Sequence, residues 1–234
     1  NISAVECAGG IAGKSPSALL FVYDCANTGD ISVTAGNYAG GIAGSVQGAQ
    51  VRGCMSAGYI SAKGLNAGNF VGGIAGEADD VRYCMSAATV KGENYLGGIC
   101  GKADGTLIGC YSNVLLLPSE DTIQAGMIAG AAEAFNASLD SFGENVKGNY
   151  YIGEGGGIGG VDYGKKYEYA AASITSEKLA SSDTLSPYLC EDFSSEYWQG
   201  GNGKTTYPTL YYFENTEECD EFDNDDKWNS LFAK

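Results

Sequence analysis

The chain has 234 residues, among them 36 glycines, eight cysteines and no histidine, and its formal net charge is −16. This charge argues against a nucleic-acid partner and against anionic membrane surfaces, because both require clustered Lys and Arg. The absence of histidine removes His-dependent triads, Cys-His dyads and nearly all catalytic zinc sites. No apolar run is long enough to span a bilayer, so no membrane insertion is expected.

A Gly-Gly-Ile-Ala-Gly motif recurs five times along the chain. The fourth copy has Cys in place of Ala, and the fifth has Met in place of the second Gly. The copies begin at Gly9, Gly40, Gly72, Gly97 and Gly126, so that successive copies start 31, 32, 25 and 29 residues apart. A motif repeated at such a period predicts a stacked array, in which each unit buries its apolar face against its neighbours.

Each of the first four units also carries a cysteine that follows one aliphatic residue by three positions and precedes another by six. The cysteines are Cys25, Cys54, Cys84 and Cys110, and the aliphatic residues that follow them are Ile31, Ile60, Val90 and Leu116. Each unit therefore has three short β-prone segments separated by turn residues, and no segment with helical periodicity. This pattern predicts an all-β fold, a right-handed parallel β-helix of about five rungs with three short strands each.

Equivalent residues of successive rungs should lie about 4.8 Å apart and form ladders. One inward ladder comprises the motif isoleucines Ile11, Ile42, Ile74, Ile99 and Ile128, and the four cysteines form another. We expect the cysteines to be buried, reduced thiols, because inward side chains on parallel strands point the same way. Disulfide bridges are the alternative, since neighbouring Cα atoms would lie within bridging range.

The repeats divide the chain into three regions. Residues 1–155 are predicted to form the β-helix, residues 156–213 a capping segment, and residues 214–234 an acidic tail or linker. Ile2 stands seven residues before its Gly-Gly pair, as Val90 does, so the sequence opens midway through a rung. We therefore expect further rungs upstream in the full protein.

The fifth rung is interrupted. Residues 131–142 carry apolar residues at i, i+4 and i+7, which predicts a short inserted amphipathic helix. These apolar residues are Phe135, Leu139 and Phe142. The rung resumes at residue 146, and Asn149 takes the place of the ladder cysteine.

The C-terminal region is expected to close the stack with a small α+β cap. Residues 173–189 read as one helix, and Trp198 with residues 207–210 reads as a closing strand pair. Four aromatic residues are candidate ligand-binding residues, because aromatic faces suit pyranose rings. They are Tyr163, Tyr167, Tyr169 and Trp198. The alternative is that these side chains form the core of the cap.

Three motifs suggest cofactors but lack the required context. Residues 8–15 are one glycine short of a P-loop, and residues 155–160 fit GxGxxG without a helix after them, so no nucleotide is predicted. Residues 223–226 are mostly acidic but lack the Gly and distal Glu of an EF-hand loop. No cofactor and no metal site are therefore predicted.

Gly-Gly-Ile-Ala-Gly combined with aliphatic-x-x-Cys and a following Gly-x-Ile resembles the GLUG-motif repeats. Those repeats occur in surface proteins of anaerobic gut bacteria and in the N-terminal regions of streptococcal IgA1-cleaving metallopeptidases. The resemblance covers about residues 2–155, and Trp198 with residues 207–210 is similar to the segment that often closes such arrays. It implies a β-helical region that is secreted or displayed on a bacterial surface. It carries no catalytic residues, since the zinc-binding His-Glu-x-x-His of the metallopeptidases needs histidine.

The leading functional hypothesis is a non-enzymatic extracellular binding or display module, part of a cell-surface adhesin. Its partners would be host glycans, mucins or matrix proteins, and the acidic charge favours glycans, cationic proteins or Ca²⁺-bridged contacts over polyanions. Two alternatives stay open: a structural spacer in a larger surface protein with further domains, and a polysaccharide-degrading β-helix enzyme. The repeat places no pair of carboxylates on neighbouring rungs at the separation that glycoside hydrolysis requires. The residues that could serve an enzyme are Asp79, Asp80, Arg52 and Arg82.

Overall fold

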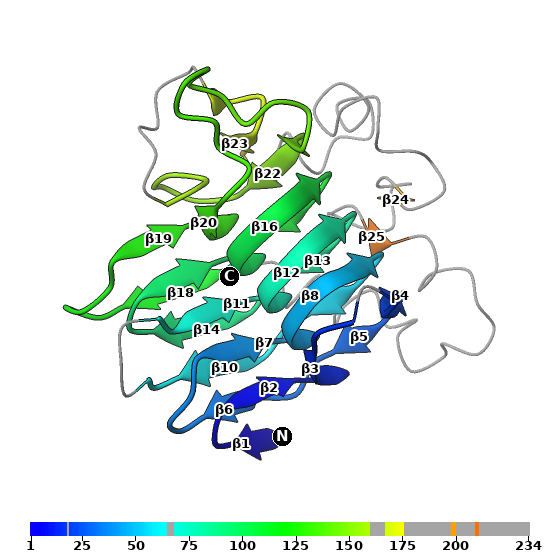
Figure 1. The fold of residues 1–234 in the computed structure, drawn as a ribbon, viewed down its shortest axis with the longest axis vertical. Coiled ribbons are helices and arrows are strands. Elements are labelled where there is room, and N and C mark those ends of the chain that lie inside the picture. Colours follow the sequence, from blue (N-terminus) through cyan, green and yellow to red (C-terminus); the bar gives the residue numbers. More distant parts are fainter. Residues whose placement is uncertain (18, 65–67, 160–166, 176–197, 200–208, 211–234) are drawn as a thin grey trace.

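The computed structural model describes residues 1–17, 19–64, 68–159, 167–175, 198–199 and 209–210. In these residues the chain is all-β and forms a right-handed parallel β-helix, which confirms the fold predicted from the repeat. Its strands stack into four parallel sheets, here called A to D, and Figure 1 shows the stack rising from the blue N-terminal turn. The described part of the chain contains no helix that is long and apolar enough to cross a membrane.

Each turn contributes strands to the four sheets in the order A, B, C and D. Sheet A contains β1 (Ile2–Ala4), β6 (Ile31–Val33), β10 (Tyr59–Ala62), β14 (Thr89–Gly92) and β18 (Leu115–Pro118). Sheet B contains β2 (Cys7–Gly9), β7 (Tyr38–Gly40), β11 (Phe70–Gly72), β15 (Tyr95–Gly97) and β19 (Gln124–Gly126). Sheet C contains β3 (Ala12–Ser15), β4 (Phe21–Tyr23), β8 (Ala43–Arg52), β12 (Ala75–Arg82), β16 (Cys100–Ile108), β20 (Ala129–Ala132) and β21 (Val146–Lys147). Sheet D contains β5 (Ala26–Asn27), β9 (Met55–Ser56), β13 (Met85–Ser86), β17 (Tyr111–Ser112), β22 (Asn149–Tyr151) and β23 (Ala171–Ser173).

The turns have four strands and not the three that the sequence predicts, because a sharp corner separates sheet C from sheet D. Five residues at equivalent positions form this corner with φ angles between 51° and 63°: Asp24, Gly53, Tyr83, Gly109 and Gly148. Glycine adopts this left-handed conformation without a Cβ clash, whereas Asp24 and Tyr83 adopt it against their intrinsic preference. Most of the sheet D strands that follow are only two residues long, too short to show a period in the sequence.

The predicted isoleucine ladder forms the axis of the core. The amides of the first four isoleucines each donate to the isoleucine carbonyl of the next turn at 2.8–2.9 Å, and the amide of Ile128 donates to the carbonyl of Gly157 at 2.8 Å. Four members are completely buried: Ile42, Ile74, Ile99 and Ile128. Ile11, in the first turn, is 53% exposed. The ladder therefore gives the internal turns a continuous apolar core, which the turns on either side shield from solvent.

The cysteine ladder is also present, and its members are free thiols, as predicted. Cys54, Cys84 and Cys110 are completely buried, and Cys25 is half-buried. Each thiol donates to the carbonyl two residues earlier at 3.1–3.5 Å. Asn149 occupies the next position of the ladder, as the sequence predicts. Burial raises the pKa of the Cys84 thiol well above its ordinary value, which disfavours its reactive thiolate form.

The first glycine of the repeated motif is required by a close approach between sheets B and C. A Cβ atom at Gly72 would lie 2.0 Å from the carbonyl oxygen of Ala75, and one at Gly97 would lie 1.7 Å from that of Cys100. Both distances are far below van der Waals contact. The chain can therefore turn from sheet B to sheet C only where this position has no side chain.

The helix predicted for residues 131–142 is absent. After β20 the chain runs through turns that are closed by an antiparallel bridge between Asn136 and Ser141. The ring of Phe142 is buried and lies 5.0 Å from that of Phe135, centroid to centroid. The apolar spacing therefore reflects packing within a folded loop and not the face of a helix.

Only part of the predicted cap lies within the described residues. The expected closing pair is present, since β24 (Trp198–Gln199) and β25 (Thr209–Leu210) are antiparallel partners. The helix predicted for residues 173–189 begins at the last residue of β23, and residues 176–189 lie outside the described part of the chain. The boundaries at residues 155 and 213 stay predictions.

Candidate functional site

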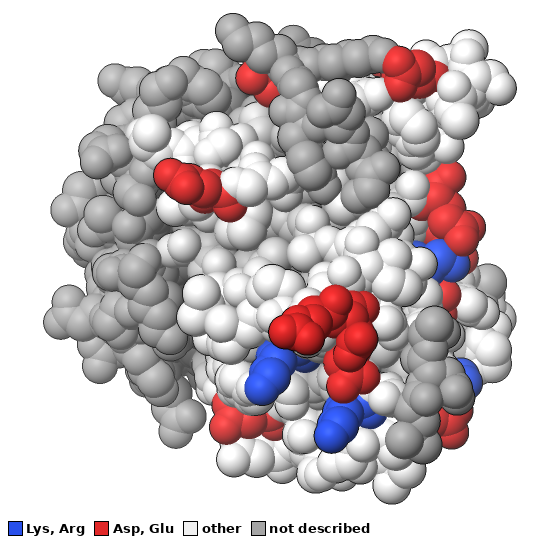
Figure 2. Space-filling model, turned by 90° about the vertical axis from the view of Figure 1, so that its left-hand side faces the viewer, with Lys and Arg blue, Asp and Glu red and all other residues white. Residues whose placement is uncertain are grey.

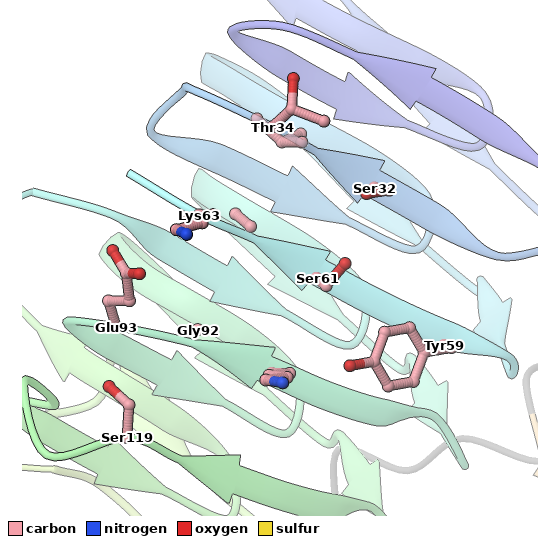
Figure 3. Close-up of a pocket in the computed structure, with 11 residues that line it drawn as sticks. Ser32, Thr34, Tyr59, Ser61, Lys63, Gly92, Glu93 and Ser119 are labelled. Carbon is pink, nitrogen blue, oxygen red and sulfur yellow. The ribbon is translucent and has the colours of Figure 1, made fainter. Parts of the chain in front are cut away.

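The outer face of sheet A is hollowed by a depression of about 480 Å³, which is within the size range of small-ligand sites. It extends over β6, β10 and β14 to the residue that follows β18, a distance of about 14 Å at 4.8 Å per strand. Its polar lining comprises Ser32, Thr34, Tyr59, Ser61, Lys63, Lys91, Glu93 and Ser119. Figure 3 shows eight of the lining residues with labels, distributed over successive turns. We call this feature the sheet A depression.

Strand alternation directs these side chains outward. The buried positions of sheet A pair in register as Ile31, Ile60 and Val90. The next residue of each strand faces the opposite side, which makes an outward column of Ser32, Ser61 and Lys91. The apolar column therefore anchors the sheet to the core, while the outward column is free to vary.

Tyr59 supplies the large aromatic surface of the depression. Its side chain is 39% exposed, and its amide donates to Oδ1 of Asp30 at 2.9 Å, which fixes the start of β10. Figure 3 shows its hydroxyl directed toward the other labelled lining residues. An aromatic ring beside several hydroxyl groups suits a ligand with an apolar face and a polar rim.

Two lysines give the depression its charge. Lys63 and Lys91 are exposed, and neither forms an ion pair among the described residues. Glu93 is the one carboxylate in the lining, and it accepts a hydrogen bond from the amide of Gly64 at 3.2 Å. The other basic residues of the described ranges form ion pairs, and in Figure 2 Lys and Arg side chains lie beside Asp and Glu.

The charged residues predicted for an enzyme lie on sheet C, where ion pairs tie adjacent turns together. Asp80 lies 2.6 Å from Nε of Arg82 and 3.4 Å from Arg52 on the preceding turn. Asp79 accepts a hydrogen bond from the amide of Gly48 at 2.5 Å. The structure thus brings the four residues into one region, where Asp80 pairs with both arginines and Asp79 accepts from a backbone amide.

A second ionic group on sheet C is centred on Lys102. Its Nζ lies 2.6 Å from Asp104, 2.8 Å from Glu133 and 3.4 Å from the buried Glu77. Burial raises the pKa of Asp104 above its ordinary value, and the Lys102 ammonium opposes that rise. Among the described residues no group of three or more His, Cys, Asp or Glu side chains could hold a metal ion.

Sheet B carries a stack of aromatic rings on its outer face. Tyr38, Phe70 and Tyr95 are in register, and their centroids lie 5.7 and 4.8 Å apart with nearly parallel planes. Because the rings cover one another, Phe70 has no free face for a ligand. The stack therefore stabilises neighbouring turns and offers less surface to a sugar than Tyr59 does.

The aromatic residues predicted as ligand-binding are only partly within the described chain. Tyr163 lies outside it, and of Trp198 only the backbone of β24 is described. Tyr167 packs against Phe135 and Phe142, and its hydroxyl donates to Asp140. This contact is the packing that the cap-core alternative anticipates.

Tyr169 is the more accessible of the two described tyrosines. It is 44% exposed, and its hydroxyl accepts a hydrogen bond from the amide of Phe142 at 2.8 Å. It borders a second depression, of about 620 Å³, on the fifth turn. The other lining residues are Ser141, Gly143, Glu144, Lys147, Gly148 and Tyr150. Lys147 pairs with Glu144 there, so this second depression has no net basic charge.

A scan against protein-family models finds no match, and a search of curated proteins finds none. Among solved structures, the chain is similar to the crystal structure of a "putative immunoglobulin A1 protease" from Bacteroides ovatus, with a TM-score of 0.54 and 17% sequence identity. The match covers 82% of this chain and 57% of that chain. At this identity the likeness shows the fold alone, a β-helical repeat, and the resemblance to GLUG repeats rests on the sequence motifs.

Proposed function

We propose that this chain is a non-enzymatic binding and display module that holds saccharides in the sheet A depression. The observation that carries this proposal is the half-exposed ring of Tyr59 beside a set of side-chain hydroxyls on a rigid sheet. Pyranose rings have an apolar face, which stacks on an aromatic ring, and a rim of hydroxyls, which exchanges hydrogen bonds with serine and threonine. The site lies on regular strands, so little conformational entropy is lost when a ligand binds.

The proposed setting is the surface of a bacterium or the medium around it. The motif resemblance to GLUG repeats supports this setting, and so does the fold likeness to a Bacteroides ovatus protein described as a "putative immunoglobulin A1 protease". In that setting the partners would be host glycans, mucins or matrix glycoproteins. The chain would be one part of a larger surface protein, with the β-helix presenting its lateral face away from the other domains.

The test is saturable binding of the labelled chain to an array of host and microbial glycans. We expect binding to a subset of glycans, and we expect Tyr59→Ala to weaken it about tenfold or more, because a stacked aromatic ring contributes about 1–2 kcal/mol. Tyr169→Ala is the matched variant, since that ring is exposed to a similar extent (44% against 39%) and lies at the other candidate site. It should leave binding unchanged.

Three outcomes would contradict the proposal. Loss of binding with Tyr169→Ala but not with Tyr59→Ala would move the site to the fifth turn. Absence of binding to every glycan would favour the structural spacer. Turnover of any polysaccharide or peptide by the purified chain would refute the non-enzymatic part.

A further inference from the structure

We infer that the sheet A depression selects acidic saccharides, chains whose sugars carry carboxylate groups, through Lys63 and Lys91. The inference rests on the proposed function and names the ligand class of the same site. Its starting point is the distribution of ion pairs. Seven Lys and Arg residues lie in the described part of the chain, and five of them form ion pairs: Lys14, Arg52, Arg82, Lys102 and Lys147. The remaining two are Lys63 and Lys91, and both line the depression.

This placement is unexpected in so acidic a protein. With a net charge of −16, carboxylates outnumber basic residues by 29 to 13, so a surface lysine readily finds a partner. Lys63 directly follows β10, and Lys91 lies on β14, the strand beside β10 in sheet A. The arrangement leaves two ammonium groups, each with three donors, available to one ligand.

The acidic groups around the depression are already engaged. Glu93 accepts from the amide of Gly64, and Asp30, beside Tyr59, accepts from the amide of that tyrosine. Counting the lining alone, two ammonium groups face one carboxylate, so the depression has a formal charge of +1. At physiological ionic strength charges beyond about 8 Å are largely screened, so these local groups and not the charge of the whole chain act on a bound ligand.

The other lining residues indicate that the carboxylate of the ligand is carried by a sugar. Ser32, Thr34 and Ser61 offer hydroxyls that both donate and accept, and Tyr59 offers a ring. A phosphopeptide or a lipid surface would need clustered arginines or an exposed apolar rim, and the lining contains no arginine. A carboxylated sugar uses the ring, the hydroxyls and the ammonium groups together over the length of about 14 Å that the strands span.

The neighbouring turns supply the variants that test this inference. Thr34 precedes Lys63 by one turn, and Ser61 precedes Lys91 by one turn in the same column. The double variant Lys63→Thr/Lys91→Ser therefore installs residues that the same sheet already carries, so the fold is kept. Lys14→Ser is the matched control, because it removes an exposed lysine on sheet C that pairs with Glu6.

The experiment measures affinity for three probes of equal length: a short oligogalacturonate, the same oligosaccharide with its carboxylates reduced to alcohols, and that reduced oligosaccharide carrying sulfate groups. For the wild type we expect oligogalacturonate to bind about tenfold more tightly than its reduced form, and the preference to shrink as salt is added. The double variant should lose this preference and bind the reduced form as the wild type does. Lys14→Ser should behave as the wild type.

The outcomes separate the two levels of the argument. Equal binding of the acidic and reduced probes, lost in Tyr59→Ala, would refute the inference and leave the proposed function standing. Preference for the sulfated probe would refute the assignment to carboxylates. A preference that survives in the double variant would refute the role of the two lysines. Absence of binding to all three probes and to the wider array would refute the proposed function, and the inference with it.

Discussion

Asn149 ends the cysteine ladder, and replacing it with cysteine tests what the ladder requires. Its side chain is completely buried. Oδ1 accepts from the amide of Cys110 at 2.9 Å, and Nδ2 donates to the carbonyls of Leu107 and Ala170 at 2.8 and 2.9 Å. Asn149→Cys would restore the residue type of the four earlier turns and fit the space, but a thiol cannot make these three bonds.

The expected cost follows from those bonds. Each buried hydrogen bond contributes about 1 kcal/mol, so losing three costs about 3 kcal/mol, and the apolar thiol offsets a small part of that. We expect the free energy of unfolding to fall by about 2–3 kcal/mol. Cys84→Ala is the control for packing in the same ladder and should cost about 1 kcal/mol, since it removes one buried atom and no strong hydrogen bond.

The assay is urea unfolding followed by circular dichroism, together with hydrogen exchange of the Cys110 amide. Stacked turns can unfold in parts, so the exchange measurement reports the fifth turn directly. Asn149→Cys should accelerate exchange at Cys110 by about a hundredfold, while Cys84→Ala should accelerate it far less. If Asn149→Cys had the urea midpoint and the Cys110 exchange rate of the wild type, the view that the Asn149 side chain holds the last turns together would be refuted.

Two further predictions concern the core and the ionic group. Ile74→Ala should lower the free energy of unfolding by about 3–4 kcal/mol, whereas Ile11→Ala at the same ladder position should cost about 1 kcal/mol, because Ile11 is 53% exposed; equal midpoints in urea would contradict this. Burial lowers the pKa of Lys102, but hydrogen bonds to Asp104 and Glu133 outweigh it and raise that pKa above its ordinary 10.5. Its stabilisation should therefore be complete below pH 10.5 and be lost as the pH rises through the higher folded-state pKa. The free energy of unfolding of the wild type should accordingly exceed that of Lys102→Met by about 2 kcal/mol at pH 8 and by less above pH 11. A difference that does not change with pH in urea unfolding would refute the raised pKa of Lys102.

The sequence was sufficient for the fold because the residues that determine it are repeated. Gly72 and Gly97 recur where a side chain would collide with a carbonyl, and Ile74 and Ile99 recur where the core is dry. The same spacing predicted free thiols, and the structure has them. Repetition converts a weak local signal into a specific one, since independent positions would not keep one register by chance.

The errors arose where tertiary contacts determine the conformation. The spacing of Phe135 and Phe142 predicts one face of a helix, yet the two rings meet across a loop. The two-residue strands of sheet D were missed because their position depends on the left-handed corner before them, and at Asp24 and Tyr83 no glycine marks that corner. A hydrophobic period records burial but does not distinguish the backbone that produces it.

The candidate site lies where the repeat fails, which is why the period could not reveal it. Outward positions of a β-helix make no contact with the core, so packing does not constrain their residue types. In its outward column, Lys91 comes after Ser3, Ser32 and Ser61 of the preceding turns. Lys63 takes the position that Thr34 occupies one turn earlier. Each departure places a charge that the packing does not require. The same reasoning limits the prediction made from net charge: a total of −16 favours partners other than polyanions on average, but a ligand meets the few groups within a screening length. In a stacked fold the repeated residues therefore specify the architecture, and the exceptions on its outer face are where a binding function should be sought.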